Sequence, residues 1–227
     1  MDLDAAVRAV LAARCRVGSE RATLVAVSGI DGAGKGFAAA LLGKRLEEEG
    51  LKVALTNVDG WLNLPAVRFS ETDPPGHFYR HAIRFDEMWG QLIRPLRNRR
   101  SIRLEADFTE ETATAYRKHV YEWDNVDILL LEGIYLLRRD LRRRYDLSIW
   151  IDCGFETALE RAIARSQEGL SPEETTRAYR RIYFPAQEIH FEADGPREAA
   201  DLVLPNDPRL GPGPARTREA GTRCCTS

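Results

Sequence analysis

A chain of 227 residues with 44% hydrophobic content is long enough for one α/β domain with a sizeable core, and a second full domain is not expected. The 33 basic and 35 acidic residues give a formal net charge of −2, which argues against the global positive field of a non-specific nucleic-acid binder. Apolar runs stay shorter than the roughly 20 residues that cross a bilayer, and acids at Asp2 and Asp4 do not fit a secretory signal. We therefore expect a cytoplasmic protein without a nucleic-acid or membrane partner.

The first third of the chain predicts a βα unit. Ala, Val and Leu recur at helical spacing over residues 4–14, and apolar strands are expected over 23–27 and 53–58 with a helix over 37–49 between them. Two strands joined by a helix run parallel and lie in one sheet. Prolines, glycine and aromatics without a clear period over 60–81 predict a long ordered loop that shapes a pocket.

The rest of the chain predicts more strands of the same sheet and a hairpin. Alternating residues over 101–104 and, in part, over 113–123 predict a β-hairpin that projects from the main sheet, with Asp107 near its turn. Further strands are expected over 126–131, 147–151 and 200–204, and helices over 85–97, 155–166 and 172–191. Residues 208–227 are rich in Gly, Pro, Arg and Thr and predict a disordered tail, which leaves residues 1–207 as one domain with an N-terminal helix.

A phosphate-binding loop is the clearest motif of the sequence. Gly29, four further residues, then Gly34 and Lys35 satisfy the G-x-x-x-x-G-K pattern between a predicted strand and a predicted helix. Glycines let backbone N–H groups crowd an anion at the start of the helix, and Lys35 is expected to bridge the β- and γ-phosphates of ATP. The predicted nucleotide-binding residues of this loop are Gly29, Asp31, Gly32, Ala33, Gly34, Lys35, Gly36 and Phe37.

The loop lacks the hydroxyl that normally follows its lysine and binds magnesium, because Gly36 and Phe37 stand there. We therefore expect Mg²⁺ to be held through water and by carboxylates elsewhere. Asp59 and Glu132 each follow a predicted strand at the sheet edge where open α/β sheets bind ligands. Asp59 is the candidate general base, or a turn-capping residue. Glu132 is expected near the metal or the acceptor, or in a salt bridge at a strand end.

Two arginines and several aromatic residues complete the candidate set. Arg161 and Arg165 lie one turn apart on a predicted helix and are suited to clamp phosphates, although a solvated helix face explains them equally well. Trp61, Phe78 and Tyr79 are candidates to stack on a flat acceptor, although aromatic residues more often fill a core. The dense arginine run over 138–144 is interpreted as a solvated or subunit-facing surface.

Taken together and in order, these motifs resemble the uridine kinase-like family of P-loop kinases over roughly residues 24–207. The stretches that carry the resemblance are residues 29–35, 58–61, 75–79, 85–86, 94–96, 131–134, 183–187 and 200–203, with Asn206. The resemblance implies an α/β P-loop NTPase fold: a three-layer sandwich of a mainly parallel sheet and flanking helices, with a small lid and a β-hairpin. It also implies ATP and Mg²⁺, Asp59 as the catalytic carboxylate, lid positions for Arg161 and Arg165, and Asn206 beside the nucleotide base. Relatives are often oligomers, so a homo-oligomer is compatible with it.

The sequence departs from nucleoside-phosphorylating members of that family where the acceptor is chosen. Arg84 stands near the position of an acidic residue, and Ala106 replaces a tyrosine before Asp107. Since a guanidinium only donates hydrogen bonds, Arg84 favours an acceptor with a carboxylate or phosphate. The sequence therefore predicts a kinase that transfers the γ-phosphoryl group of ATP to a small-molecule hydroxyl. Uridine or cytidine is the family default, and the alternatives are an anionic or sugar-like metabolite, or an inactive nucleotide-binding regulatory protein. The predicted acceptor-site residues are Asp59, Trp61, Tyr79, Arg84, Asp107 and Glu132.

Overall fold

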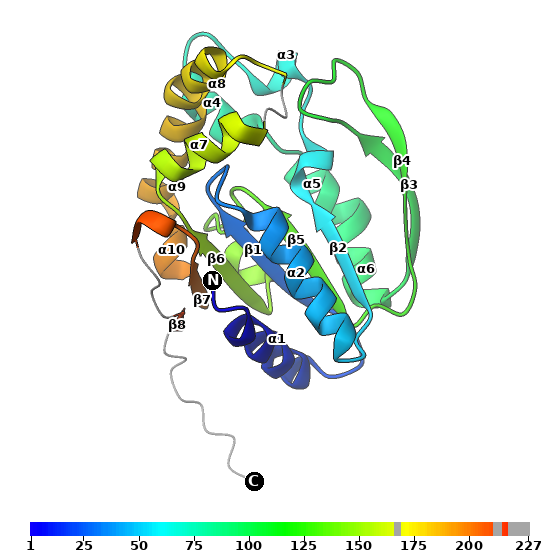
Figure 1. Cartoon of the computed structure of the whole chain (residues 1–227). Coiled ribbons are helices and arrows are strands. Elements are labelled where there is room, and N and C mark those ends of the chain that lie inside the picture. The colour runs from blue at the N-terminus through cyan, green and yellow to red at the C-terminus, as the bar shows by residue number, and fades with distance from the viewer. Residues whose placement is uncertain (166–168, 211–214, 218–227) are drawn as a thin grey trace.

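A six-stranded sheet runs through the centre of the molecule (Figure 1). The computed structural model describes residues 1–165, 169–210 and 215–217. The strand order is β2-β5-β1-β6-β7-β8, and all neighbours pair in parallel except β7 and β8. The strands are β1 Thr23–Gly29, β2 Val53–Asn57, β5 Ile128–Gly133, β6 Leu147–Asp152, β7 Leu202–Pro205 and β8 Arg216–Thr217.

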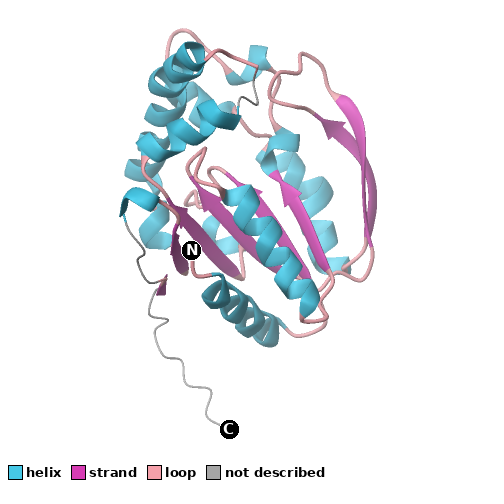
Figure 2. Ribbon diagram, in the orientation of Figure 1, coloured by secondary structure: helices cyan, strands magenta, loops and turns pink. Residues whose placement is uncertain are grey.

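Helices cover both faces of this sheet, so the predicted α/β P-loop NTPase fold with a three-layer sandwich is confirmed (Figures 1 and 2). In Figure 1, α1 and α2 lie on the face toward the viewer, and the helical stretch of residues 85–99 lies behind the sheet. Every residue of β1 and β5 is buried, as expected for central parallel strands. The helices are α1 Leu3–Val17, α2 Lys35–Glu48, α3 Pro65–Arg68, α4 Pro74–His81, α5 Phe85–Met88, α6 Arg94–Arg99, α7 Phe155–Arg165, α8 Pro172–Ala178, α9 Phe184–Asp194 and α10 Pro196–Ala199.

Two π-helical turns join shorter helices into longer rods. The turn Trp89–Ile93 links α5 to α6, and the turn Tyr179–Tyr183 links α8 to α9. Ser171 begins the second rod with a capping box. Its hydroxyl oxygen accepts a hydrogen bond from the backbone N–H of Glu174 at 3.2 Å, and the Glu174 carboxylate accepts one from the backbone N–H of Ser171 at 2.9 Å. We call residues 172–194 the lid helix, because it stands over the carboxyl ends of the strands in Figure 1.

The predicted hairpin forms a separate two-stranded sheet of β3 Ile102–Phe108 and β4 Arg117–Trp123 (Figure 2). Its first strand extends beyond the expected residues 101–104, and Asp107 pairs with Lys118 close to the turn. The carbonyl oxygen of Gly60 accepts a hydrogen bond from the N–H of Thr109 at 3.2 Å, which ties the hairpin to the segment after β2.

The prediction of a long loop over residues 60–81 is wrong. This segment contains the end of a 3₁₀ turn, Val58–Trp61, and the helices α3 and α4. The prolines that suggested a loop occupy the first turn of each helix, where proline needs no hydrogen-bond acceptor for its nitrogen. Asp73 caps α4 by accepting from the N–H of Gly76 at 3.1 Å.

Part of the predicted tail also has regular structure. Pro208–Leu210 form a 3₁₀ turn, and β8 pairs antiparallel with β7. The turn is anchored because the Asp207 carboxylate accepts hydrogen bonds from the N–H of Gly154 at 2.9 Å and from the hydroxyl of Thr157 at 2.7 Å. Residues 211–214 and 218–227 of the predicted tail, and Ser166 at the end of a predicted helix, lie outside the described residues. Within the described residues, no helix has both the length and the apolar character to cross a bilayer.

Candidate active site

The phosphate loop joins β1 to α2 and depends on three glycines that cannot carry a side chain. A Cβ on Gly29 would lie 2.7 Å from the carbonyl oxygen of Ile151, and one on Gly32 would lie 2.4 Å from that of Ala158. Gly34 has a φ of +87°, a conformation that glycine adopts without strain. Among the described residues, no side chain caps α2. The N–H groups at its start are therefore disposed to receive an anion.

Two side chains from distant segments hold this loop in place. Asn206, after β7, donates from Nδ2 to the carbonyl oxygen of Ala33 at 2.7 Å. Arg161 on α7 donates to the same carbonyl oxygen at 3.2 Å and to the carbonyl oxygen of Asn206 at 2.9 Å. Both residues contact the backbone of the phosphate loop, and the guanidinium of Arg161 supports that backbone.

Lys35 and Glu132 form a buried charged pair beneath the loop. Lys35 Nζ donates to the carbonyl oxygen of Ile30 at 3.1 Å and lies 3.8 Å from Glu132 Oε1. Asn57, at the end of β2, donates from Nδ2 to Glu132 Oε2 at 2.6 Å. Burial raises the pKa of Glu132 to about 7; Lys35 opposes this rise, and the nearby carboxylate of Asp59 adds to it.

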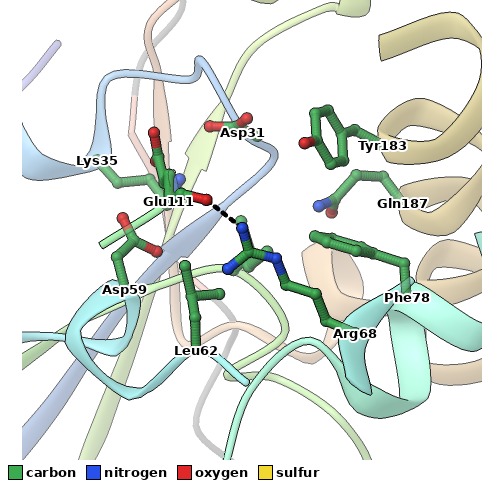
Figure 3. Close-up of a pocket in the computed structure, with 10 residues that line it drawn as sticks. Asp31, Lys35, Asp59, Leu62, Arg68, Phe78, Glu111, Tyr183 and Gln187 are labelled. Atoms are coloured by element: carbon green, nitrogen blue, oxygen red, sulfur yellow. Dashed lines mark hydrogen bonds between the residues drawn. The ribbon is translucent and has the colours of Figure 1, made fainter. Parts of the chain in front are cut away.

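Asp59 lies directly after β2, in the 3₁₀ turn, and its side chain lines the same cavity as Lys35 (Figure 3). Its backbone N–H donates to Asn57 Oδ1 at 2.7 Å, which fixes the turn. Burial raises the pKa of Asp59, and the charge of Lys35 opposes this rise. A carboxylate with a raised pKa accepts a proton more readily than an exposed one, as a general base must.

The phosphate loop is also connected to the lid helix. The Asp31 carboxylate accepts hydrogen bonds from the backbone N–H of Gly32 at 2.8 Å and from the hydroxyl of Tyr179. Arg165, at the end of α7, lies 3.6 Å from Asp31 Oδ1. The π-helical turn includes both Tyr179 and Tyr183, and such turns are frequent at functional sites. Arg165 is therefore close to the loop whose phosphates it is predicted to clamp.

A cavity of about 60 Å³ lies between the loop and the lid helix (Figure 3). It brings the predicted residues Asp31, Lys35 and Asp59 together with residues that sequence reasoning did not assign to a site. The latter are Leu62, Arg68, Glu111, Ile134, Tyr183 and Gln187, together with Phe78, which the sequence marks only as an aromatic candidate. Ile134, Tyr183 and Gln187 lie in the stretches that carry the family resemblance, so that signal could have found them, whereas none marks Arg68 or Glu111.

Besides Glu132, four predicted acceptor-site residues are placed outside this cavity lining. Trp61 is fully buried and stacks on Tyr121 with ring centroids 5.8 Å apart. Arg84 donates to Glu87 and to the carbonyl oxygen of Asp107, at 2.7 Å each, and so anchors the hairpin. The Asp107 carboxylate pairs with Lys118 at 2.8 Å on the surface. These side chains are engaged in packing and ion pairs of the scaffold.

Tyr79, the fourth of these residues, belongs to a polar cluster that joins α4 to α9 of the lid helix. Its hydroxyl donates to the Asp194 carboxylate at 2.5 Å, and His190 Nδ1 lies 2.6 Å from the same carboxylate. Burial alone would raise the pKa of Asp194, but the hydrogen bonds from His190 and Tyr79 outweigh burial and lower it to about 2. Tyr79 therefore supports α9.

The residues present fit a magnesium ion that arrives with nucleotide phosphates. Among the described residues, no three His, Cys, Asp or Glu side chains gather as a complete metal site. Mg²⁺ usually keeps several waters and uses one or two carboxylates together with substrate phosphates. A Cβ at Gly36 would lie 3.7 Å from Glu132 Oε2, so a carboxylate oxygen stands next to the position of the missing hydroxyl. The Phe37 side chain is 71% exposed.

Comparison with known proteins finds similarity in structure. No protein-family model and no curated protein sequence matches the chain. A possible uridine kinase from Bacillus stearothermophilus superposes with a TM-score of 0.68 and 20% identity, over 88% of this chain and 96% of that one. A candidate fructose transport system kinase from Silicibacter superposes with a TM-score of 0.70 and 24% identity, over 90% of this chain and 100% of that one. D-glycerate 3-kinase from Cryptococcus neoformans superposes with a TM-score of 0.69 and 13% identity, over 96% of this chain and 99% of that one. The chain thus has the fold of the uridine kinase-like P-loop kinases, as its motifs suggested.

Proposed function

We propose that this protein is a kinase that transfers the γ-phosphoryl group of ATP to a hydroxyl group of a small molecule. One observation carries the proposal: Asp59 lines the same cavity as Lys35 and Asp31 of the phosphate loop. A phosphoryl donor in the loop and an acceptor hydroxyl at Asp59 would then meet in one space. Phosphoryl transfer needs this juxtaposition and charge neutralisation more than covalent chemistry by the protein.

Each side chain of the site has a separate role in the proposed phosphoryl transfer. The loop N–H groups and Lys35 bind the phosphates and offset their negative charge. Asp59 orients the acceptor hydroxyl and takes its proton as the oxygen–phosphorus bond forms and the bond to the ADP oxygen breaks. Glu132 and Asp59 are the carboxylates that would hold Mg²⁺, directly or through water, and bound Mg²⁺ supplies further charge neutralisation at the phosphates. Arg165 lies within reach of the loop to clamp them.

The acceptor is less constrained than the reaction. A nucleoside is the default for the family that the sequence resembles, yet Trp61, Tyr79, Arg84 and Asp107 do not line the cavity. The similar structures include a possible uridine kinase, a candidate fructose transport system kinase and a D-glycerate 3-kinase. We therefore propose a hydroxylated small molecule as substrate and use a panel of acceptors to identify it.

The experiment measures ADP release from ATP and Mg²⁺ across nucleosides, sugars, sugar alcohols and hydroxy acids. Asp59→Asn should abolish acceptor-dependent release, and Lys35→Ala should do the same by weakening phosphate binding. The matched controls are Glu48→Gln, an exposed carboxylate of α2, and Asp86→Asn, an exposed carboxylate of α5; both should retain full activity. Tight ATP binding without release for any acceptor would refute the kinase proposal and favour a regulatory nucleotide-binding protein.

A further inference from the structure

A buried glutamine of the lid helix has an unpaired carbonyl group at the cavity. Gln187 lies on α9, four residues after Tyr183, so the two side chains share one face of the helix, and both line the cavity. Only 1% of the Gln187 surface is exposed, and its Oε1 has no hydrogen-bond partner in the described part of the chain. In Figure 3 the amide group points into the pocket, and Asp59 stands on the opposite side.

The position of this unpaired oxygen distinguishes it from other buried polar atoms. Most buried polar side chains form a hydrogen bond, because a polar group that leaves water without gaining a partner costs free energy. Several buried side-chain atoms lack a partner within residues 1–165, 169–210 and 215–217, and among them only Gln187 Oε1 belongs to a residue that lines the cavity. The missing donor can therefore come from a molecule that enters the cavity.

The neighbouring walls suit a ligand with a carbon skeleton. Leu62, Phe78 and Ile134 also line the cavity, and their side chains carry no polar atom that could pair with the amide. The ring of Phe78 packs against that of Tyr183 with centroids 5.1 Å apart, which extends the apolar wall beside Gln187. Small-molecule sites are typically built in this way, from apolar walls and a few polar groups that orient the ligand.

The chemistry of the amide specifies which group it binds. A glutamine side chain offers an acceptor oxygen and an NH₂ donor, and a hydroxyl group both donates and accepts, so a hydroxyl satisfies either end of the amide. The hydroxyl that reacts belongs at Asp59, on the other side of the pocket in Figure 3. The hydroxyl at Gln187 is therefore a second one.

We propose that Gln187 binds a second, non-reacting hydroxyl group of the phosphoryl acceptor, so that the substrate is a diol or polyol and not a compound with a single hydroxyl. The proposal rests on the proposed kinase function and names the substrate class of that site. Gln187 is then a specificity-determining residue, because an acceptor that lacks this hydroxyl leaves the buried amide unpaired.

The test compares acceptors with analogues that lack one hydroxyl: uridine with 2′-deoxyuridine and 3′-deoxyuridine, ribose with 2-deoxyribose, and glycerate with 3-hydroxypropanoate and lactate. Binding is measured by titration calorimetry in the presence of a non-hydrolysable ATP analogue, and turnover is measured with ATP. In at least one set, removal of one hydroxyl should weaken binding about 5- to 100-fold, the range expected when a buried polar group is left unpaired.

Gln187→Met keeps the size of the side chain and removes its hydrogen-bonding groups. This variant should bind the acceptor and its deoxy analogue with equal affinity and should leave the affinity for the ATP analogue unchanged. Without ligands its melting temperature should be no lower than that of the unaltered protein, because the amide oxygen has no partner within the described chain to lose. The matched control is Gln91→Met, at an exposed glutamine between α5 and α6, which should keep the preference for the acceptor.

The two proposals fail in different ways. Equal turnover of acceptors and deoxy analogues in every set would overturn the role of Gln187 and leave the kinase function standing. Binding that depends on Gln187 and on the second hydroxyl, but without any ADP release, would overturn the kinase function and leave the hydroxyl subsite standing.

Three further results would also overturn the role of Gln187. One is a preference for the hydroxylated acceptor that survives Gln187→Met, or no binding in any set. Another is a Gln187→Met variant that melts at a lower temperature without ligands, since the amide would then have a structural partner. The third is uridine binding that Gln187→Met weakens although neither missing hydroxyl affects it, which would assign the amide to the edge of the base.

Discussion

Replacing Glu132 by glutamine should stabilise the protein at alkaline pH and have little effect at acid pH. In the unfolded chain this carboxyl ionises near its ordinary pKa of 4.5, whereas burial moves its pKa in the folded state to about 7. Between these pH values the folded state binds more protons than the unfolded state, so the free energy of unfolding falls as pH rises. An amide of the same shape has no proton to lose and avoids this loss.

The expected size of the effect follows from the pKa difference. The difference between about 7 and 4.5 is about 2.5, which corresponds to roughly 3 kcal/mol at about 1.36 kcal/mol per pKa unit. The Glu132→Gln variant should therefore be more stable than the unaltered protein by roughly 3 kcal/mol at pH 8.5, and by less than about 1 kcal/mol at pH 5. For a protein of this size, this stabilisation raises the melting temperature at pH 8.5 by about 6–12 °C.

Thermal melts followed by circular dichroism at pH 5 and pH 8.5 measure the effect without nucleotide. Asn57 Nδ2 donates to Glu132 Oε2 at 2.6 Å, and the amide oxygen of the Glu132→Gln variant keeps an acceptor for it. Glu48→Gln, on the exposed surface of α2, serves as the control, and its melting temperature should differ little from that of the unaltered protein at either pH. A Glu132→Gln variant that is less stable at pH 8.5, or equally stabilised at both pH values, would refute the reasoning. ATP turnover should fall in this variant even where stability rises, because the residue is a proposed metal ligand.

Other single substitutions test the phosphate loop and the buried cluster of α9. Gly32→Ala should abolish ATP binding in titration calorimetry, because the added Cβ would lie 2.4 Å from the carbonyl oxygen of Ala158. The control is Gly50→Ala, at a φ of +83° with open space around it, which should lower the melting temperature and leave ATP binding unchanged. Arg161→Ala should weaken ATP binding about tenfold, since a loop carbonyl loses a charged donor. Asp194→Asn should lower the free energy of unfolding by about 2 kcal/mol at pH 7, and urea titrations should show this difference vanish as pH falls from about 4 to about 2.

The parts of the site that the sequence predicts are those fixed by local pattern. The phosphate loop follows from glycine spacing between a strand and a helix, and Gly29, Gly32 and Gly34 each meet backbone or a neighbouring side chain where a Cβ would lie. Asp59 and Glu132 follow from a topological rule, because they lie at the carboxyl ends of parallel strands that meet at one edge of the sheet. These predictions needed no knowledge of how distant segments pack.

The parts that the sequence does not predict depend on tertiary packing. Arg68 meets the backbone of Glu111, 43 residues further along, because α3 and the hairpin turn lie together, and no local period marks either residue. Arg84 shows the converse case: its charge suggested contact with the acceptor, and in the structure its guanidinium donates to Glu87 and to the hairpin backbone. Proline over 60–81 is typical of loops but also begins helices, and only the cap at Asp73 separates these two interpretations.

The short strand β8 has a consequence for how the molecule behaves at high concentration. Residues 216–217 pair with Leu202 and Val203 and so cover backbone groups of β7 that would otherwise face outward. An uncovered parallel strand at the rim of a sheet is a template on which a second molecule can add its own strand. Strand β8 thus protects this edge of the sheet from pairing with a second molecule, and a variant without β8 should aggregate more readily during purification although every residue that lines the cavity is retained.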